Sequence, residues 1–421
     1  MSDKAANVLE TVKAQMEGRD IYLWGARQGG YSMCRVLERL GYHPKGFIDS
    51  SVSLQDEKIL GFTIHSPEEI LGREPRPYII ITSSFYCDEI AALCRGAGLT
   101  SPEDFISHQE LQRFEYCVDV VGSCNLRCIS CPRANYPRQP KPGFMSVEDY
   151  RKVLAKILRD DPFVGAVYLY NYGEPLLHPQ LADIVRATNE MGVHATVSSN
   201  LNIRHDFSDV IKARPSWFRV SVSGVGDNYH ITHTGGSWDL FLENMHRLQK
   251  WRDAYHPEMQ VEVYYHIYRH NGDKDFETVR ELAEKLGFTF RFRHAGLHAM
   301  ENIEDIIEGR PLSPEAQQTR ELLAFDVDEA IALARQQKDM PCSYERCLWI
   351  SWDMRVRHCI EWFNPDLHLV EGEFLNTTLE AIQAARQASD FCRRCKERGI
   401  HRYLIINGDE TLVHEKKSIK W

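Results

Sequence analysis

The chain has 421 residues, of which 43% are hydrophobic and 26% are charged, so it is long enough for two or three domains with sizeable cores. Its formal net charge of −10 argues against general nucleic-acid binding, which requires Lys and Arg to neutralise phosphates. The sequence has no run of about 18 apolar residues and no charged-then-apolar segment at its start, so we expect neither a membrane span nor export. We therefore expect a cytoplasmic protein.

Residues 1–110 have the pattern of a small Rossmann-like α/β domain. A polar helix over 5–17 precedes an apolar strand at 21–24, and a Gly-rich turn then leads into an amphipathic helix. Further strands are expected up to Asp49 and over 79–82.

The Gly-rich turn resembles the dinucleotide-binding fingerprint. Gly25, Gly30 and Asp49 fit its first glycine, its last glycine and its ribose-binding acid. Arg27 stands at the second glycine, where a side chain hinders close approach to a pyrophosphate, so the pattern argues against ordinary NAD binding. The domain also resembles modules of sugar-nucleotide enzymes. Nucleotide-sugar binding and a docking or purely structural role are both open.

After a linking stretch at 101–112, strand-like and helix-like runs alternate. One helix is expected over 146–158, with Ser146 as its cap, and another over 179–191. Consecutive βαβ units form a parallel sheet, so we expect a partial (β/α)6 barrel over 111–298 with its chemistry at the carboxyl ends of the strands. The six strands are expected at 114–121, 166–170, 193–198, 217–223, 261–267 and 288–292.

The loop after the first of these strands carries three cysteines in a C-x3-C-x2-C run, Cys124, Cys128 and Cys131. Three thiolates on one loop indicate a metal, and a four-iron cluster with three protein ligands keeps one iron open to a small molecule. With the N-L-R insert and Pro132 after the last cysteine, the loop resembles the radical S-adenosylmethionine (radical SAM) superfamily. The resemblance implies a [4Fe–4S] cluster whose open iron binds S-adenosylmethionine (SAM), from which one electron releases a 5′-deoxyadenosyl radical.

Other strand ends extend this resemblance. The N-Y-G-E-P turn at 171–175 resembles the superfamily's G-G-E-P element, which holds the methionine ammonium, and S-S-N at 198–200 resembles its T-N-G element, with Leu201 in place of the glycine. His266 and His294 end the fifth and sixth strands, and either a role at the site or an ordinary structural one is open. The cofactor-binding residues that the resemblance implies are Tyr172, Gly173, Glu174, Ser199, Asn200, Ser221, Ser223 and His266.

Residues 299–340 have a helical and acidic pattern and are expected either to cover the barrel mouth or to act as a plain connector. Residues 341–421 form a small cysteine-rich domain that resembles the SPASM extension of the superfamily, which binds one or two auxiliary clusters. Because no cysteine follows Cys395, we expect one auxiliary [4Fe–4S] cluster. The resemblance implies the ligands Cys342, Cys359, Cys392 and Cys395, with Met354 in place of a turn glycine. A structural zinc site is the alternative, because paired cysteines also bind zinc.

Cys347 has no place in this ligand set. In some radical epimerases a thiol returns a hydrogen atom to the substrate, so Cys347 is a candidate catalytic hydrogen donor. The alternatives are a cluster ligand and a small buried hydrophobic residue.

Three functions fit these observations. The first is a radical enzyme that oxidises, epimerises or rearranges a sugar or nucleotide-linked carbohydrate, with electrons from a donor such as flavodoxin or ferredoxin. The second is a peptide-modifying maturase, a frequent activity of SPASM proteins. The third is a non-enzymatic metal-cluster module, which would not need the strand-end elements of the barrel.

Overall fold

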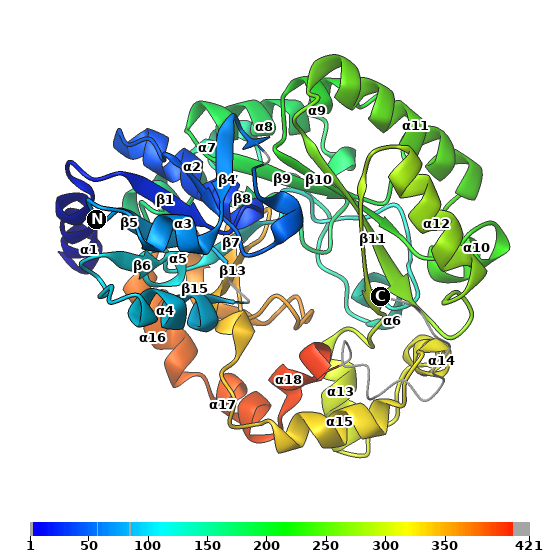
Figure 1. Ribbon diagram of the computed structural model, residues 1–421. Coiled ribbons are helices and arrows are strands. Elements are labelled where there is room, and N and C mark those ends of the chain that lie inside the picture. Colours follow the sequence, from blue (N-terminus) through cyan, green and yellow to red (C-terminus); the bar gives the residue numbers. More distant parts are fainter. Residues whose placement is uncertain (1–2, 57, 84–85, 407–421) are drawn as a thin grey trace. The chain divides into compact units, whose positions relative to one another are not determined.

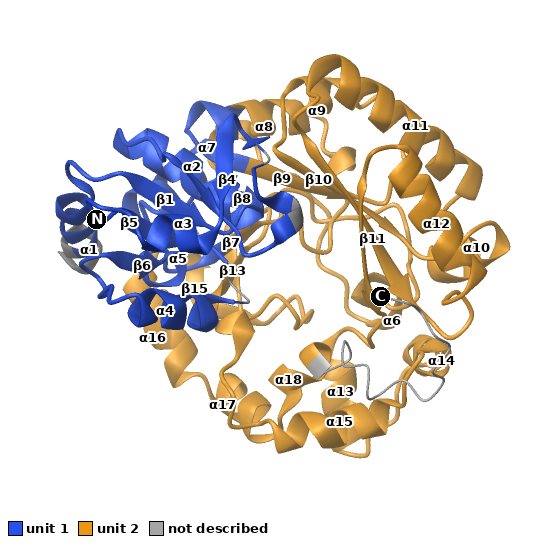
Figure 2. Cartoon of the chain, viewed as in Figure 1, with its two compact units in different colours: residues 1–115, 151–167, 187–194 blue, residues 116–150, 168–186, 195–421 orange. Residues whose placement is uncertain are grey.

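The computed structural model describes residues 3–56, 58–83 and 86–406, and the chain divides into two compact units (Figure 2). Unit 1 consists of residues 1–115, 151–167 and 187–194, and unit 2 of residues 116–150, 168–186 and 195–421. The predicted α/β fold class is confirmed, because two sheets built largely of parallel strands are flanked by helices.

A six-stranded sheet forms the core of unit 1. Its order is β3 (Lys58–Ile59), β4 (Phe62–His65), β2 (Gly46–Ile48), β1 (Ile21–Trp24), β5 (Tyr78–Ile81) and β6 (Phe105–Ser107). β1 pairs in parallel with β2 and β5, so Leu23 lies between Phe47 and Ile80. Strands covered on both faces are apolar throughout, and β1 and β5 are buried at every position.

Helices cover both faces of this sheet (Figure 1). α1 (Asp3–Met16) and α2 (Gln28–Leu40) contribute to the core around Leu23, and α3 (Pro67–Leu71) and α4 (Cys87–Gly96) contribute to the core around Trp24. The stretch 101–112 is not the linker we expected, because it contributes β6 and α5 (His108–Leu111) to the same layers. The predicted Rossmann-like α/β fold of this part of the chain is confirmed, and the domain boundary at residue 110 stays a prediction.

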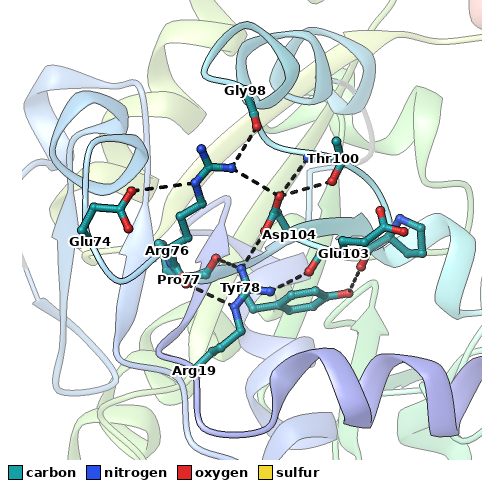
Figure 3. Close-up of polar contacts among 10 residues, drawn as sticks. Arg19, Glu74, Arg76, Pro77, Tyr78, Gly98, Thr100, Glu103 and Asp104 are labelled. Atoms are coloured by element: carbon teal, nitrogen blue, oxygen red, sulfur yellow. Dashed lines mark hydrogen bonds and ion pairs between the residues drawn. The ribbon is translucent and has the colours of Figure 1, made fainter.

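Arg19, just before β1, ties together the amino ends of three strands of unit 1 (Figure 3). Its guanidinium donates to the backbone carbonyls of Arg76 (3.1 Å), Pro77 (2.7 Å) and Glu103 (2.6 Å). It also donates to the carboxylate of Asp104 at 2.9 Å. These bonds satisfy carbonyls that precede β5 and β6, so the network has a structural role.

The second sheet has nine strands in the order β12-β11-β10-β9-β8-β7-β13-β14-β15. Neighbouring strands from β9 to β12 are parallel, and β14 is antiparallel to both β13 and β15. All six strands expected for the partial barrel are present. The bounds are β7 Glu115–Val118, β8 Ala166–Tyr168, β9 His194–Ser199, β10 Trp217–Val222, β11 Gln260–Ile267, β12 Thr289–His294, β13 Cys347–Ile350, β14 Arg355–Arg357 and β15 His368–Glu373.

Helices alternate with these strands. They are α6 (Pro132–Asn135), α7 (Val147–Asp160), α8 (Leu181–Glu190), α9 (Ser208–Lys212), α10 (Asp227–Thr232), α11 (Trp238–Tyr255) and α12 (Lys274–Lys285). The predicted cap of α7 is confirmed, because the Ser146 hydroxyl accepts a bond from the Asp149 N–H at 3.0 Å. No helix in the described part of the chain is long and apolar enough to cross a bilayer.

The two faces of the barrel strands differ in character. Along β10, Phe218, Val220 and Val222 are buried, whereas the alternate positions, including Arg219 and Ser221, keep part of their surface accessible. Alternate residues of a strand point to opposite faces, and Figure 1 shows α11 and α12 on the outer side of β10 and β11. The outer face is therefore the apolar core, and the inner face is polar and partly accessible.

The C-terminal segment continues the barrel sheet. The Asp119 N–H, just after β7, donates to the Ile350 carbonyl of β13 at 2.8 Å, and β13, β14 and β15 extend the sheet beyond this edge. All but one of the remaining helices contribute to a buried core that includes Trp362 and Cys395, and the exception is α16 (Leu379–Ala388). The contributing helices are α13 (Met300–Ile307), α14 (Pro314–Leu322), α15 (Val327–Gln336), α17 (Asp390–Glu397) and α18 (Ile400–Ile406). The predicted domain boundaries at 299 and 341 stay predictions.

Candidate functional site

The three-cysteine loop lies between β7 and α6. Burial raises the pKa of the Cys124 thiol to about 12 and raises the pKa values of Cys128 and Cys131. The charges of neighbouring thiolates add to the shifts of Cys124 and Cys128, whereas Arg133 opposes the shift of Cys131. The three sulfur atoms therefore lie within electrostatic reach of one another. Thiols in such a place become thiolates only when a cation compensates their charge.

Other strands and helices of unit 2 hold this loop in place. The main chain of the loop is bonded on two sides, and the hydroxyl side chain of Ser130 is also bonded. An ordered loop of this kind presents its ligands without first losing conformational entropy. The bonds run from Arg127 N–H to the Thr234 carbonyl (3.0 Å), from Ile129 N–H to the Thr232 carbonyl (3.1 Å), from the Thr319 hydroxyl to the Ile129 carbonyl (2.6 Å) and from the Tyr268 hydroxyl to Ser130 Oγ (2.6 Å).

The turn after β8 contains the predicted residues Tyr172, Gly173 and Glu174. A side chain at Gly173 would overlap the Val121 carbonyl, so only glycine fits there. Backbone N–H groups of residues 171–173 act on the buried carboxylate of Asp119 and favour its charged form. The turn after β8 is thus built onto the end of β7, where the cysteine loop begins.

Glu174 joins this turn to the end of β9. It is 3% exposed, and its two oxygens accept bonds from the N–H groups of Leu176 (3.1 Å) and Asn200 (2.9 Å). Burial raises its pKa to about 7, while these bonds and the Ser199 hydroxyl oppose the shift. Both oxygens already have backbone partners, so the glutamate fixes the two loops relative to each other.

Ser199 and Asn200 bring the end of β9 to the cysteine loop. The Asn200 amide nitrogen lies 3.7 Å from Cys124 Sγ and 3.0 Å from the side-chain oxygen of Asn125. The Leu126 N–H also points to Cys124 Sγ, at 3.5 Å. N–H donors around a sulfur atom favour its thiolate form, so this donor set fits an iron–sulfur cluster held by three cysteines.

The predicted residues of β10 and β11 lie next to each other. The Ser223 hydroxyl accepts a bond from the His266 N–H at 3.3 Å, and the Ser221 backbone accepts one from His233. Burial lowers the pKa of His266 well below its usual value, and Arg293 is the strongest of several cationic groups that lower it further. His266 is therefore neutral at pH 7. His294 ends β12 and is buried.

Tyr172, which replaces the first glycine of the family motif, lies between the two groups of cysteines. Burial raises its pKa well above the usual value, and both Cys131 and Cys359 contribute to the shift. Its ring contacts those of Phe363 and Trp349 edge-on, with centroids 5.2 and 5.7 Å apart. The substitution thus adds an aromatic contact between the barrel and the C-terminal segment.

Four of the five C-terminal cysteines lie together. Burial raises the pKa of Cys395, and the charges of Cys342, Cys359 and Cys392 raise it further. Burial also raises the pKa of Cys359 to about 12. Cys347 lies at the start of β13. The fold therefore brings the four residues implied by the resemblance near one another, and their role as ligands stays a prediction.

Among the described residues, no three His, Cys, Asp or Glu side chains form a site for a single metal ion. Cys395 belongs to the helical core that includes Trp362, and Cys359 packs against that core. The donor set thus fits an iron–sulfur cluster.

The Gly-rich turn of unit 1 is held by hydrogen bonds within the same unit. The Asp49 carboxylate accepts bonds from the N–H groups of Ala26 (3.3 Å) and Ser51 (2.9 Å). Gly30 lies too close to the Gly25 carbonyl to carry a side chain, whereas Arg27 is exposed. These contacts explain the turn structurally, and nucleotide binding there stays a prediction.

Sequence reasoning missed a group of polar and aromatic residues on the inner face of the barrel. Arg219 Nε donates to the Glu262 carboxylate at 2.9 Å, and the guanidinium lies over the Tyr264 ring at 4.6 Å. Tyr170, just after β8, is within electrostatic reach of this pair. The signal was present in the sequence as polar residues at alternate strand positions, but the pattern alone did not tell the inner face from the outer one.

Comparison with known proteins agrees with this site. Residues 118–287 match the model of the radical SAM superfamily, and this part of the chain belongs to that superfamily. Membership implies SAM and a [4Fe–4S] cluster as cofactors. The chain is also 29% identical over 87 residues to a tungsten-containing aldehyde ferredoxin oxidoreductase cofactor-modifying protein of Pyrococcus furiosus, a match that spans 20% of this chain and 22% of that relative.

Solved structures similar to the chain include BtrN in complex with AdoMet and 2-DOIA, with 17% identity and a TM-score of 0.39 over 70% of this chain and 91% of that one. They also include SuiB of Streptococcus suis bound to the precursor peptide SuiA, with 11% identity and a TM-score of 0.45 over 75% and 80%. Native anSMEcpe with bound AdoMet has 12% identity and a TM-score of 0.44 over 71% and 92%.

Proposed function

We propose that the protein is a radical SAM enzyme that removes a hydrogen atom from a carbohydrate-like or nucleotide-linked substrate. The observation that carries this proposal is the convergence of the three-cysteine loop with the turns after β8 and β9, through Asn200 and Glu174. When bound and reduced, the [4Fe–4S] cluster supplies the electron that releases a 5′-deoxyadenosyl radical from SAM.

The residues of the chain hold and order the cofactor. Cys124, Cys128 and Cys131 are assigned as the cluster ligands, and Asn200 directs a donor to one of their sulfur atoms. Glu174 fixes the turn after β8, and the main chain of this turn would hold the methionine group. The neutral ring of His266 and the hydroxyl groups of Ser221 and Ser223 complete the assigned site on β10 and β11.

A second cluster is assigned to Cys342, Cys359, Cys392 and Cys395 in a SPASM-like segment over 341–421. Their mutual effect on pKa supports one site for all four. A cluster with four protein ligands has no open iron, which favours electron transfer over substrate binding, so oxidation is the favoured outcome. Structural zinc is the alternative at this site, and metal analysis separates the two.

Cys347 is the remaining candidate hydrogen donor. It lies three residues before Ile350 on β13, and Ile350 bonds the backbone of Asp119. Three residues of a strand span about 10 Å. Cys347 therefore lies about this far along β13 from Ile350, the residue that is bonded next to the turn after β8. This position favours oxidation over epimerisation. Electrons would come from a cytoplasmic flavodoxin or ferredoxin.

The test is anaerobic reconstitution followed by reduction with dithionite in the presence of SAM. Wild-type protein is expected to form 5′-deoxyadenosine and methionine, and Cys128→Ala is expected to form neither. Incubation with sugars, nucleotide sugars and peptides, followed by mass spectrometry, then identifies the substrate class. Absence of 5′-deoxyadenosine from protein with full iron content would refute the proposal, and modification of a peptide alone would replace its substrate class.

A further inference from the structure

The inner face of the partial barrel carries an array that the cofactor site does not use. We call Tyr170, Arg219, Glu262 and Tyr264 the inner-face array. The Arg219 side chain is 32% exposed and that of Glu262 is 9% exposed, and both tyrosines keep part of their surface accessible. The buried residues of β10 and β11, such as Val220 and Val263, face the helices instead.

Arg219 is held rigidly within this array. Its Nε donates to Glu262 Oε1 at 2.9 Å, and its plane lies over the Tyr264 ring at 4.6 Å. Among the described residues, the two terminal nitrogens of Arg219 and the second oxygen of Glu262 have no hydrogen-bond partner. The pair therefore offers fixed donors and one fixed acceptor side by side.

Aromatic rings border this pair. The Tyr264 ring contacts the His266 ring with centroids 5.2 Å apart, and the Tyr170 ring contacts that of Tyr168 at 6.0 Å. An aromatic ring offers a flat apolar surface with a polar edge. The array thus combines flat apolar surfaces with adjacent donors and an acceptor.

We infer that the inner-face array binds the polyhydroxylated ring of the substrate, a sugar or cyclitol, with Arg219 and Glu262 bonding neighbouring hydroxyl groups and Tyr264 and Tyr170 lining the ring. This inference rests on the proposed radical function and names the substrate class for the same barrel. Hydroxyl groups both donate and accept, which matches the adjacent donors and acceptor.

Two other ligand classes fit this array less well. An anion beside Arg219 would also meet the carboxylate of Glu262, which repels it. An extended peptide is recognised mainly through main-chain bonds to an exposed strand edge, whereas the array consists of side chains on strands that are paired on both sides.

The test measures binding without turnover. Reconstituted, unreduced protein with SAM is titrated calorimetrically with glucose, N-acetylglucosamine, myo-inositol and UDP-glucose, and separately with trialanine. We expect at least one polyol to bind wild-type protein, and Arg219→Lys, Glu262→Gln and Tyr264→Ala each to weaken it about tenfold or more, because each leaves a partner unsatisfied or removes a ring surface. Tyr264→Phe keeps the ring and should retain most of the affinity.

Arg247→Lys is the matched control, because Arg247 forms an exposed ion pair with Glu243 on α11. The inference would be overturned if all three array variants bound the polyol as tightly as wild type does. It would also be overturned if wild-type protein bound none of the polyols, or bound only trialanine. The uncoupled formation of 5′-deoxyadenosine by the same proteins is a separate readout. If wild-type protein formed no 5′-deoxyadenosine, the radical function would be refuted. The calorimetric result, in contrast, tests only the role of the inner-face array.

Discussion

Asp119 shows how a single buried residue supports the site. It follows directly after β7, and its carboxylate faces the turn that carries Gly173. Burial raises its pKa from 3.8 to about 6, while Arg133 and the N–H groups of residues 171–173 oppose this shift. The residue is therefore close to its neutral form at mildly acidic pH and charged at neutral pH.

The first prediction concerns this titration. Because the pKa of Asp119 is higher in the folded chain, the neutral carboxyl stabilises the fold below about pH 4, and this contribution is lost as pH rises to about 6. Asp119→Asn should remove the dependence, which is about 1.4 kcal/mol per pH unit in this window. Unfolding midpoints of the two proteins across the window test this. Asp209→Asn, which replaces an exposed carboxylate on α9, should show the same pH dependence of its unfolding midpoint as wild type.

Two residues take a left-handed backbone conformation where the superfamily resemblance implies glycine. Leu201 has φ 52° and Met354 has φ 62°. The side chain of Leu201 is buried, which offsets the strain, whereas that of Met354 is only half-buried. L-residues pay about 1–2 kcal/mol for this conformation. The family turns are thus present without their glycines.

The second prediction follows for Met354. Met354→Gly should change the free energy of unfolding by less than about 1 kcal/mol, because the relief of strain offsets the greater freedom of glycine in the unfolded chain. Met354→Val should destabilise by more than about 1 kcal/mol, because a branched side chain resists positive φ. Denaturant titration measures both changes. Equal effects of the two substitutions would contradict this account.

At the scale of elements, the turn between β13 and β14 clamps the start of the cysteine loop. The Trp352 indole donates to the Lys141 carbonyl at 3.2 Å, and its ring lies so close to Gly122 and Gly143 that a side chain at either would overlap it. The Gly122 N–H also donates to the Gly143 carbonyl at 2.9 Å. The C-terminal hairpin thus helps to order a loop of the barrel.

The third prediction tests this clamp. Gly143→Ala should displace the Trp352 ring, loosen the loop and lower the iron content of the three-cysteine site together with SAM cleavage. Gly96→Ala is the control, because nothing lies within 4 Å of a side chain placed there. Iron analysis and tryptophan fluorescence give two readouts. Full iron content with an altered fluorescence spectrum would show that the loop does not depend on the clamp.

At the scale of the whole molecule, the chain combines a Rossmann-like sheet, a partial barrel and a C-terminal extension of the barrel sheet. The extension brings Cys359 close enough to Tyr172 to raise the pKa of Tyr172. Cys131 raises the same pKa. The two groups of cysteines therefore act on one side chain.

The fourth prediction concerns metal content. Wild-type protein should hold about eight irons and eight sulfides per chain, the content of two [4Fe–4S] clusters. Cys395→Ala should lower both to about four while 5′-deoxyadenosine still forms, and Cys347→Ala should leave both near eight. Zinc together with about four irons in wild-type protein would refute the second cluster.

Much of the fold and part of the site could be predicted from the sequence. The barrel strands were found because apolar runs and helical periodicity are local signals, and the three-cysteine loop was found because Cys124, Cys128 and Cys131 are neighbours in the chain. The stretch 101–112 was missed as part of the first sheet because β6 has only three residues. Short strands carry too little pattern to stand out.

Tertiary structure alone decided the contacts between distant residues. The bonds of Glu174 to Asn200, the clamp by Trp352 and the pairing of Arg219 with Glu262 all depend on strand register and on which edge of the sheet β13 joins. No local pattern encodes these choices, because they are set by the joint packing of segments far apart in sequence. The sequence by itself determined the spacing of the cysteines and the architecture, and the fold determined what surrounds those cysteines.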